Sequence, residues 1–503
     1  MKIFRFLMVM MATVLLAGFS SCKDDADDII DNGNENTQSE VYLNVNIAIP
    51  NDNSSMKSAE GDTNPKEAAT ADEYRVEVVN LYFFNDGSGL YAGTVSLVKT
   101  TDLNAATPSG DATVYSSKTK RTTLARSTTY KVFAIVNGDA STPLGAATTA
   151  DDFMKDDKLD NTAFLTTVPT GSTGGLVMAS RTGGTSPYVT LTIPGSNSEN
   201  NPATLVMDVE RTVGKLVVTS DRVDNKYDLE VNSSKIADVE LVNYAVVNTM
   251  KQGFAFRHTG DATSVASYKY GKIDASSEYL MDPQTHLKTL PYVSASAPGW
   301  YNDHVSVPTA FTYAAMPAYD SDPATASKII GYCNENAMEK DSQINGYSTG
   351  LIFEAKVTPV GGTVIDEDSN PVAAPANFYY YDGKFYKDIA AVNKVFVGGS
   401  VPSSATAKEL KDNYGVLYLV GGICYYNYWI RHENNGTSDM GIMEFSIVRN
   451  NVYKMKVTGI GAIGSSIPDI DPEDENEISD AFIKMEMTIL PWIVRDNSNI
   501  TLQ

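Results

Sequence analysis

A long succession of short apolar segments, each bounded by Gly, Asn, Asp, Ser or Pro, constrains the fold of this chain more than any other feature. The segment 41–49 alternates apolar with mostly polar residues, which is the pattern of a β-strand with one buried face. The segments 76–84 and 130–136 are apolar on both faces, as interior strands are, and a turn signal with Asn and Gly follows each. Because segments 176–178 and 188–193 continue the pattern, we predict a β-rich fold.

The chain divides near residues 194–203, where it becomes polar and contains proline, as linkers between domains do. A second set of strands begins with the segment 205–218, and short helices are expected only at places such as 324–330 and 405–412. We therefore predict an all-β protein of two β-sandwich domains, residues 58–200 and 201–503, with a few short helices.

The N-terminus has the features of a lipoprotein signal peptide. Lys2 and Arg5 precede an apolar run, and a stretch of small residues ends at Cys22. The run is too short for a membrane span, so we predict a signal peptide over residues 1–21. The residues before Cys22 resemble a bacterial lipoprotein box, which predicts that Cys22 is acylated and anchors the chain through its acyl carbons. Ordinary signal cleavage beside an unmodified cysteine is the alternative.

Three residues after the cysteine bear on export. Lys23, Asp24 and Asp25 resemble the signal that sends lipoproteins of the Bacteroidetes to the outer face of the outer membrane. The same residues also fit a solvated acidic linker. Because residues 22–40 are polar and acidic, we predict that they form a tether ahead of the first strand.

The chain is strongly acidic, with a formal net charge of −23. Residues 1–21 contain two basic residues and no acidic ones, so their removal makes the charge −25. We therefore expect no nucleic acid among the partners. Besides Cys22 the chain has only Cys333 and Cys424, which either pair in an oxidising envelope or remain as buried thiols.

Motifs for catalysis or metal binding are weak. Residues 346–350 fit G-x-S-x-G, but a polar segment precedes them and a predicted strand follows, whereas a nucleophile elbow needs a strand before and a helix after. His258, His286, His304 and His432 lack metal-ligand spacing. In the acidic run 469–475, Asp474 stands where a calcium loop needs glycine. We expect no enzyme activity, metal or cofactor.

The C-terminal strands are specific enough to suggest a family. The segment 444–457 contains Val-Arg-Asn-Asn-Val-Tyr, a loop rich in Pro, Asp and Glu follows at 467–480, and the segment 484–492 ends in Leu-Pro-Trp. Together with the segments 209–215 and 422–430, they resemble the Bacteroidales fimbrillins, the subunits of type V pili. Within that family the chain is most similar to the shaft subunit of the minor, or short, fimbria.

The resemblance implies two transthyretin-like sandwich domains, export to the cell surface as a lipoprotein, and polymerisation by strand exchange after a protease removes the first strand, residues 41–57. A sheet that loses a strand exposes backbone N–H and C=O groups and apolar pockets that invite another chain. The expected partners are identical subunits in a head-to-tail polymer, fimbrial tip and anchor proteins, the maturation protease, and the outer membrane through the lipid.

The expected donor strand lies between Phe482 and Leu502. Ile483, Met485, Met487 and Ile489 project to one face and charged or polar residues project to the other, which suits a half-buried slot. The alternative is that this segment is the ordinary last strand of the second domain.

The processing site departs from the family pattern. Fimbrillins are typically cut after an arginine in the loop that follows the first strand, but between Pro50 and Tyr74 this chain has only Lys57 and Lys66. The loop is polar and suits a protease cleft, so we predict cleavage after Lys57. Arg75 is less suitable because it borders the strand expected at 76–84.

Two other functions also fit the sequence. The 28 tyrosines and three tryptophans fit a stacking platform of a surface glycan-binding or nutrient-capture lipoprotein. A tip or anchor component of the same fimbria is the other alternative. The resemblance favours the shaft subunit of an extracellular fimbria that supports adhesion or biofilm formation.

Overall fold

The computed structural model describes residues 38–50, 67–109, 112–138, 144–155, 158–159, 164–171, 174–181, 186–260, 269–270, 279–290, 292, 305–306, 314–317, 329–437, 439–468, 470–476 and 482–494. Strands predominate and helices are few and short, so the predicted all-β class is confirmed. None of the helices in these ranges is both long and apolar enough to cross a membrane.

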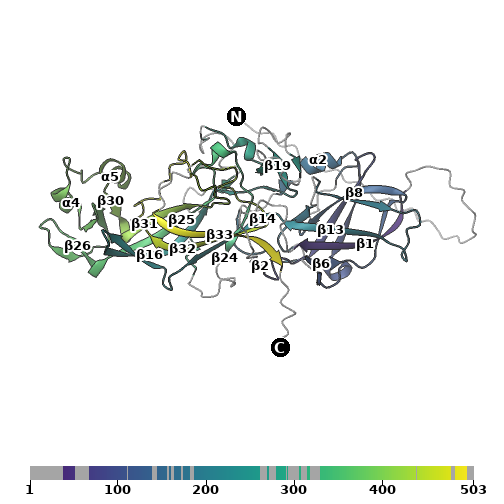
Figure 1. Cartoon of the computed structure of the whole chain (residues 1–503), viewed down its shortest axis with the longest axis horizontal. Coiled ribbons are helices and arrows are strands. Elements are labelled where there is room, and N and C mark those ends of the chain that lie inside the picture. Colours follow the sequence, from purple (N-terminus) through teal and green to yellow (C-terminus); the bar gives the residue numbers. More distant parts are fainter. Residues whose placement is uncertain are drawn as a thin grey trace, which may run out of the picture. The chain divides into compact units, whose positions relative to one another are not determined.

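The N-terminal strands form a ten-stranded sheet in the order β4-β3-β8-β11-β13-β1-β6-β5, to which β12 and β7 add by pairing with β8 and β1 (Figure 1). Its strands are β1 (Gln38–Pro50), β3 (Val78–Asn85), β4 (Tyr91–Val98), β5 (Thr107–Ser109), β6 (Ala112–Ser116), β7 (Lys120–Ala125), β8 (Thr128–Val136), β11 (Met178–Arg181), β12 (Val189–Ile193) and β13 (Ala203–Arg211). Side chains of β4, at one end of this order, and of β6, next to the other end, belong to one core, so the sheet curls around it.

The strands β3 and β8 are apolar on both faces because both faces are covered. One face joins the core of the curled sheet, while Phe84 and Phe133 on the other face pack with Phe153 of helix α2 (Ala150–Lys155) and with Phe256. Phe133 and Phe153 pack edge to face, which adds to the effect of their burial. The helix α1 (Lys99–Asp102) is a single turn after β4 and buries no residue.

Two further sheets face each other across a second core. One has the order β10-β24-β14-β32-β33-β2, with β10 (Phe164–Leu165), β24 (Ile329–Asn334), β14 (Val213–Ser220), β32 (Asn451–Ile460), β33 (Ile483–Val494) and β2 (Glu67–Ala69). The other has the order β15-β16-β25-β31, with β15 (Lys226–Val231), β16 (Ser234–Val247), β25 (Gly350–Pro359) and β31 (Ile423–Trp429), and β23 (Ala314–Ala315) pairs with β16. Alternate residues of both sheets, such as Val218 and Phe353, line the shared core, which is the arrangement of a β-sandwich.

The chain passes from the first sheet to the second within one apolar segment. The pattern at 205–218 predicts a continuous strand, but β13 ends at Arg211 in the ten-stranded sheet and β14 begins at Val213 in the next. The change of sheet therefore falls at Thr212, after the boundary expected at 194–203. The Thr212 hydroxyl donates to the carbonyl of Val177, which holds the chain at this corner.

A small sheet with two helices is inserted between β25 and β31. It has the order β27-β26-β29-β28-β30, with β26 (Thr363–Ile365), β27 (Pro371–Ala373), β28 (Phe378–Tyr381), β29 (Lys384–Tyr386) and β30 (Leu417–Leu419), and Figure 1 shows α4 (Ile389–Val395) and α5 (Ala407–Tyr414) beside it. Helix α5 confirms the helix expected near 405–412. Its N-terminus has a capping box of Thr406 and Glu409, and its end is Gly415 with φ of 63°. The helix expected at 324–330 is wrong at its end, where Ile329 and Ile330 begin β24.

The remaining described elements are short. They are the pairs β9 (Lys158–Leu159) with β18 (Gly253–Phe254) and β17 (Thr249–Met250) with β22 (Val305–Ser306), the group β19 (His258–Gly260), β20 (Lys269–Tyr270) and β21 (Tyr279–Met281), and the 3₁₀ turns η2 (Thr285–Leu287), η4 (Lys340–Ser342), η5 (Val360–Gly362) and η6 (Val420–Gly422).

Buried charges join the two sheets where the chain changes from one to the other. The Glu73 carboxylate is fully buried, 2.9 Å from the Lys215 ammonium, and it accepts a hydrogen bond from the Tyr332 hydroxyl. Burial alone would raise the pKa of Glu73, but Lys215 and Tyr332 together bring it below its ordinary value. The Arg211 guanidinium donates to the Glu73 carbonyl and to the Asn450 side-chain oxygen. It therefore connects β13 to two segments that are remote in the sequence. Separating the members of such a cluster leaves a buried charge without a partner, which is strongly destabilising. The cluster therefore favours one arrangement of the two sheets.

Both cysteines of the second core are free thiols. Cys333 of β24 and Cys424 of β31 are almost completely buried, and burial raises the pKa of each to about 12. Of the two possibilities left by the sequence, the structure has the buried thiols and not the disulfide.

Native protein should therefore resist thiol reagents at neutral pH, because thiolate is the reactive form and neither sulfur is accessible. Reaction with a chromogenic disulfide reagent is expected to be negligible for Cys333 and Cys424 until denaturant is added, when both react. A Cys22→Ala variant leaves Cys333 and Cys424 as the two cysteines that can react with the reagent. Rapid native labelling of either cysteine would contradict this assignment.

Candidate functional site: the slot of the first strand

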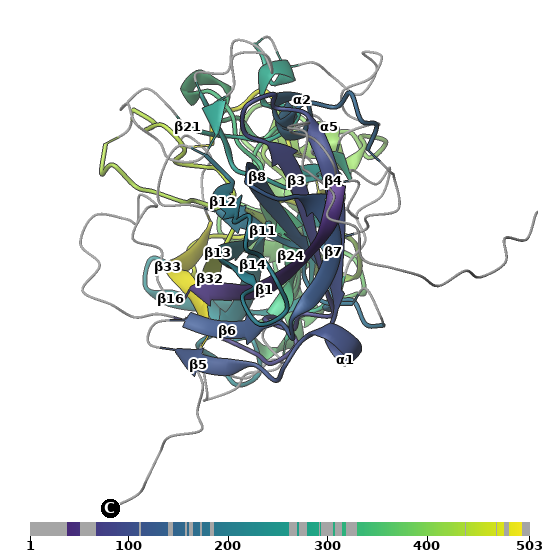
Figure 2. The same ribbon diagram turned by 90° about the vertical axis from the view of Figure 1, so that its right-hand side faces the viewer.

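The first strand is an interior strand of the ten-stranded sheet. β1 pairs in parallel with β13, in a register from Leu43 opposite Ala203 to Ala48 opposite Asp208. On its other edge it pairs antiparallel with β6, from Asn46 opposite Ser116 to Pro50 opposite Ala112, and also with β7 (Figure 2). Both edges of β1 are thus occupied, and its departure would expose the backbone of β13 and β6.

The predicted alternation of β1 is confirmed, and its apolar face is completely enclosed. The inward side chains are each at most 1% exposed, and they are Val41, Leu43, Val45, Ile47 and Ile49. Burial of one such side chain contributes roughly 1.5–3 kcal/mol, so the five together contribute on the order of 10 kcal/mol. That equals much of the roughly 5–15 kcal/mol that stabilises a typical domain, so the slot needs an occupant.

Two polar side chains complete the backbone pairing of β1. The Asn197 amide accepts from the Tyr42 N–H at 2.7 Å and donates to the Tyr42 carbonyl at 3.0 Å, so it substitutes for a neighbouring strand. The Ser117 hydroxyl accepts from the Val45 N–H at 2.9 Å, and the Ser117 N–H donates to the Val45 carbonyl. Asn197 is 1% exposed, which makes it a fixed part of the slot.

The expected donor segment lies in the chain's own second sandwich. β33 pairs antiparallel with β32, from Ile483 opposite Ile460 to Pro491 opposite Asn451. Ile483 is buried, and Met485, Met487 and Ile489 are partly buried against the second core, while Lys484, Glu486 and Thr488 are exposed. In this conformation β33 is therefore the last strand of the sandwich, as the alternative reading of the sequence has it, and a donor role requires it to change partners.

The outer edge of β33 is covered only near its end by described strands. β2 pairs in parallel with it, from Glu67 opposite Trp492 to Ala69 opposite Val494. β2 follows closely on the predicted processing loop, and the buried Glu73 lies just beyond it. The described stretch after the predicted cut at Lys57 therefore begins with a strand that pairs in the second sandwich and not with β1.

Several predicted site residues lie outside the described part of the chain. These are Cys22, Lys23, Asp24, Asp25 and Lys57, together with His304. Arg75 is described: its guanidinium donates to the Pro169 carbonyl, and its own carbonyl accepts from the Asn137 side chain.

The residues of the weak catalytic and metal motifs are buried or hydrogen-bonded within the fold. The strand β25 directly follows the G-x-S-x-G segment, and Ser348 is fully buried with its hydroxyl hydrogen-bonded to Asn476. Both ring nitrogens of His258 contact backbone carbonyls, and burial lowers the pKa of His258 to about 3. His432 contacts the Tyr453 hydroxyl at 2.9 Å. Across the described ranges no group of three or more His, Cys, Asp or Glu side chains is arranged to hold a metal ion.

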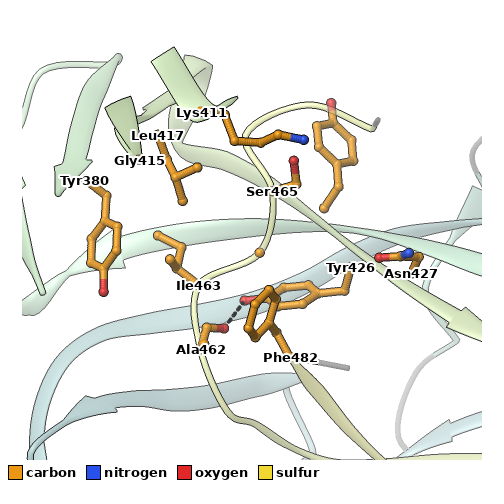
Figure 3. Close-up of a pocket in the computed structure, with 12 residues that line it drawn as sticks. Tyr380, Lys411, Gly415, Leu417, Tyr426, Asn427, Ala462, Ile463, Ser465 and Phe482 are labelled. Carbon is orange, nitrogen blue, oxygen red and sulfur yellow. Dashed lines mark hydrogen bonds between the residues drawn. The ribbon is translucent and has the colours of Figure 1, made fainter. Parts of the chain in front are cut away.

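A pocket of about 430 Å³ lies where the inserted sheet meets β31 (Figure 3). Aromatic rings line much of it, including Tyr380, Tyr425 and Tyr426, and the exposed ring of Phe482 stands at its edge. The Tyr426 hydroxyl donates to the Ala462 carbonyl at 3.2 Å, which fixes that ring. Lys411 and Ser465 are among its polar residues.

The sequence segments that carried the family resemblance lie side by side. β14 pairs in parallel with β32, with Lys215 opposite Val452, and the Asn450 N–H donates to the Val213 carbonyl. Arg449 is fully buried, pairs with Glu335 at 2.7 Å, and donates to the carbonyls of Phe254 and Ala255. These motif residues join β14 to β32 within one sheet and tie the turn before β32 to Glu335 and to the segment at 254–255.

A family model described as the C-terminal part of fimbrillin, the major fimbrial subunit protein type IV, matches residues 418–498. This segment is therefore similar to the C-terminal region of fimbrillin. It begins within β30 and contains β31, β32 and β33, so the Val-Arg-Asn-Asn-Val-Tyr motif lies inside it. The fimbrillin resemblance expected from the sequence is confirmed, whereas the closer likeness to the shaft subunit of a minor fimbria stays a prediction.

Solved structures similar to this chain have low identity to it. A candidate cell adhesion protein from Parabacteroides distasonis is 13% identical with a TM-score of 0.40, and the match covers 90% of this chain and 100% of that one. The tip fimbrial protein Mfa3 from Porphyromonas gingivalis, truncated at its C-terminus, is 11% identical with a TM-score of 0.36 over 90% and 100%. The anchor protein Mfa2 from the same organism is 14% identical with a TM-score of 0.21 over 42% and 60%. No curated protein matches the chain.

Sequence reasoning missed Asn197 and Ser117. Both lie in polar stretches, far from β1 in the chain, so no periodic pattern marks them. The only local signal for Asn197 is that it stands in the segment GSNSENNPAT, which reads as a linker.

Replacing Asn197 with Ala should destabilise the protein by about 1 kcal/mol, because the partly buried N–H and carbonyl of Tyr42 would both lose their hydrogen-bond partner. Asn201→Ala is a matched control, since Asn201 is exposed and a surface substitution changes stability by only about 0.5 kcal/mol or less. Midpoints of urea unfolding measure both effects. Equal midpoints for the two variants would show that Asn197 is not needed to hold β1.

Proposed function

We propose that this protein is the structural shaft subunit of a cell-surface fimbria, exported as a lipoprotein and polymerised by protease-triggered strand exchange. The role is mechanical and not enzymatic. The observation that supports it best is the slot of β1, an interior position filled by a long strand that directly precedes the predicted processing loop. The fimbrillin C-terminal region supports the same function.

Cleavage matters because of competition for the slot. While β1 stays covalently attached, it occupies the slot at a high effective concentration, and a strand from another subunit cannot displace it at a useful rate. After cleavage at Lys57, β1 is held only by noncovalent contacts and can leave with the lipid-bearing N-terminus. The exposed edges of β13 and β6 then accept a strand from a neighbouring subunit.

The tail from Phe482 to Leu502 supplies that strand in this proposal. Its alternation of apolar and polar residues suits the slot. Exchange breaks the hydrogen bonds of the tail with β32, and new hydrogen bonds with β13 and β6 replace them. Partial exposure of Met485, Met487 and Ile489 in the monomer makes this strand less tightly held than β1. A contact from tail to slot does not close on itself, so it produces a filament.

Acylation at Cys22 and export through Lys23, Asp24 and Asp25 belong to the same proposal. They would hold the precursor at the outer membrane until processing releases the subunit, with tip and anchor proteins as further partners. Adhesion or biofilm formation would follow from the assembled fimbria. A tip or anchor role is the alternative within the fimbria.

The processing step predicts different outcomes for the two lysines. Lys57→Gln should leave lipidated, unpolymerised monomers at the cell surface, whereas Lys66→Gln should assemble normally because cleavage after Lys57 already frees β1. N-terminal sequencing and mass spectrometry of purified fimbriae check this. Fimbriae whose subunits still carry residues 41–50 would overturn the mechanism.

The tail predicts a face-specific effect. Replacing Met487 and Ile489 together with Asp should abolish the ladders of polymers on unboiled gels, because burying a carboxylate in an apolar slot costs several kcal/mol. Thr488→Asp is the matched control, since Thr488 lies on the exposed face of the same strand. Circular dichroism must show that the double variant is folded. Polymers of normal length from that folded variant would exclude β33 as the donor.

A second candidate function is glycan binding by a surface lipoprotein. The specific observation in its favour is the tyrosine-lined pocket beside the inserted sheet (Figure 3), because aromatic faces with a few polar groups suit sugar rings. This function is compatible with a fimbrial subunit that also adheres. Ladders on unboiled gels distinguish a polymerising subunit from a capture protein that stays monomeric.

A further inference from the structure

A buried lysine lies against an asparagine side chain and an aspartate. Lys288, at the end of η2, is 1% exposed, and Asp282 and Asn336 are completely buried. The Lys288 Nζ donates to the Asn336 Oδ1 at 2.6 Å, to the Ala337 carbonyl at 2.7 Å, and to the Asp282 carboxylate. None of these residues takes part in the strand slot, the tail or the pocket.

The lysine nitrogen is close to the amide carbon of Asn336. A carbonyl bond is about 1.23 Å long, so a nitrogen 2.6 Å from Oδ1 lies within about 4 Å of Cγ. Reacting atoms held at about 3–3.5 Å in a fixed orientation react as if at very high concentration. The pair is thus nearly in position for attack of Nζ on Cγ.

The asparagine amide is held in one orientation. Its Nδ2 donates to the Tyr347 carbonyl at 2.8 Å, to the Thr349 hydroxyl at 2.9 Å and to the Asn248 carbonyl at 3.1 Å. Because all three groups accept, the nitrogen faces them and the oxygen faces Lys288. The carbonyl oxygen therefore lies on the side of the lysine, with the electrophilic carbon one bond behind it.

Asp282 is placed to move protons. Its Oδ2 accepts from the Lys288 Nζ and from the N–H of Ala337, the residue after Asn336 in the chain. Its Oδ1 accepts from the Gln284 N–H, so the carboxylate is fixed beside the lysine. Burial lowers the pKa of the Lys288 ammonium, against the opposing effect of Asp282, which favours the nucleophilic amine.

We propose that Lys288 and Asn336 form an intramolecular isopeptide bond, with Asp282 as the acid and base of the reaction. The ammonium gives a proton to Asp282, and the resulting amine attacks Asn336 Cγ. The bond from Cγ to Nδ2 then breaks. The proton that the attacking nitrogen gives up passes through Asp282 to the departing nitrogen, which leaves as ammonia. A new amide joins the two side chains, and no oxidant, reductant or co-substrate is required.

The bond would tie η2 covalently to the segment after β24. The Asn336 N–H donates to the Ile447 carbonyl and the Ile447 N–H to the Asn336 carbonyl, so the cross-link would also lie beside the fimbrillin C-terminal region. Residues 289–335 would become a closed covalent loop. A closed loop restricts the unfolded chain and stabilises the folded one, as a disulfide does, without using either buried thiol.

Mass spectrometry of the full-length wild-type protein, digested under denaturing conditions, tests the proposal. The expected result is a branched peptide that contains Lys288 and Asn336, with a mass lower by one ammonia than that of the two linear peptides. Asp282→Asn should give only the two linear peptides, and Asp341→Asn, an exposed control, should keep the branched one.

Two outcomes overturn the proposal. Linear peptides of unmodified mass from the wild-type protein would show that Lys288 is only an ion-paired buried lysine. A branched peptide from Asp282→Asn would show that Asp282 is not the acid and base. The wild-type measurement decides about the bond even if Asp282→Asn fails to fold.

Discussion

The ten-stranded sheet is continuous only because β1 joins β13 to β6. The three strands come from distant parts of the sequence, and no other described strand pairs with both of the neighbours of β1. The whole apolar face of β1 is buried, and Asn197 and Ser117 supply the backbone hydrogen bonds that a regular ladder would leave incomplete. A fold that places so much of its core on a strand at one end of the chain depends on that strand, or on a substitute with the same pattern.

The charge cluster between the sheets has a different role. Glu73, Lys215 and Arg211 connect the segment just after the predicted processing loop to the first strand of the second sandwich, and Asn450 adds the fimbrillin region. Loss of β1 would not touch these contacts. A chain that had lost β1 would therefore keep its attachment to the second sandwich, and the change would be confined to the slot.

The sequence predicted strands where periodicity or two-sided apolar runs marked them, as for β1, β3, β8 and β25. It predicted helix α5 approximately, and the capping box of Thr406 and Glu409 is a local feature that fixes where this helix begins. It did not predict the break at Thr212, since Val-Glu-Arg-Thr-Val reads as one strand and only the tertiary partners of Glu210 and Arg211 explain the corner. Charged residues in an apolar run look exposed, yet Arg211 and Arg449 are buried because each finds acceptors from segments remote in sequence. Local sequence patterns also did not predict which strands pair with each other, and so they did not predict the slot of β1.

The parallel pairing of β1 with β13 has one more consequence. Any strand that reuses the hydrogen bonds of β13 must run in the same direction as β1, since reversing it changes the spacing and slant of the ladder. Every junction of an assembly built this way would then have one orientation, and the fibre would have polarity. One terminal subunit would present an empty slot and the opposite one an unused tail, so growth and capping at the two ends would need proteins of different design.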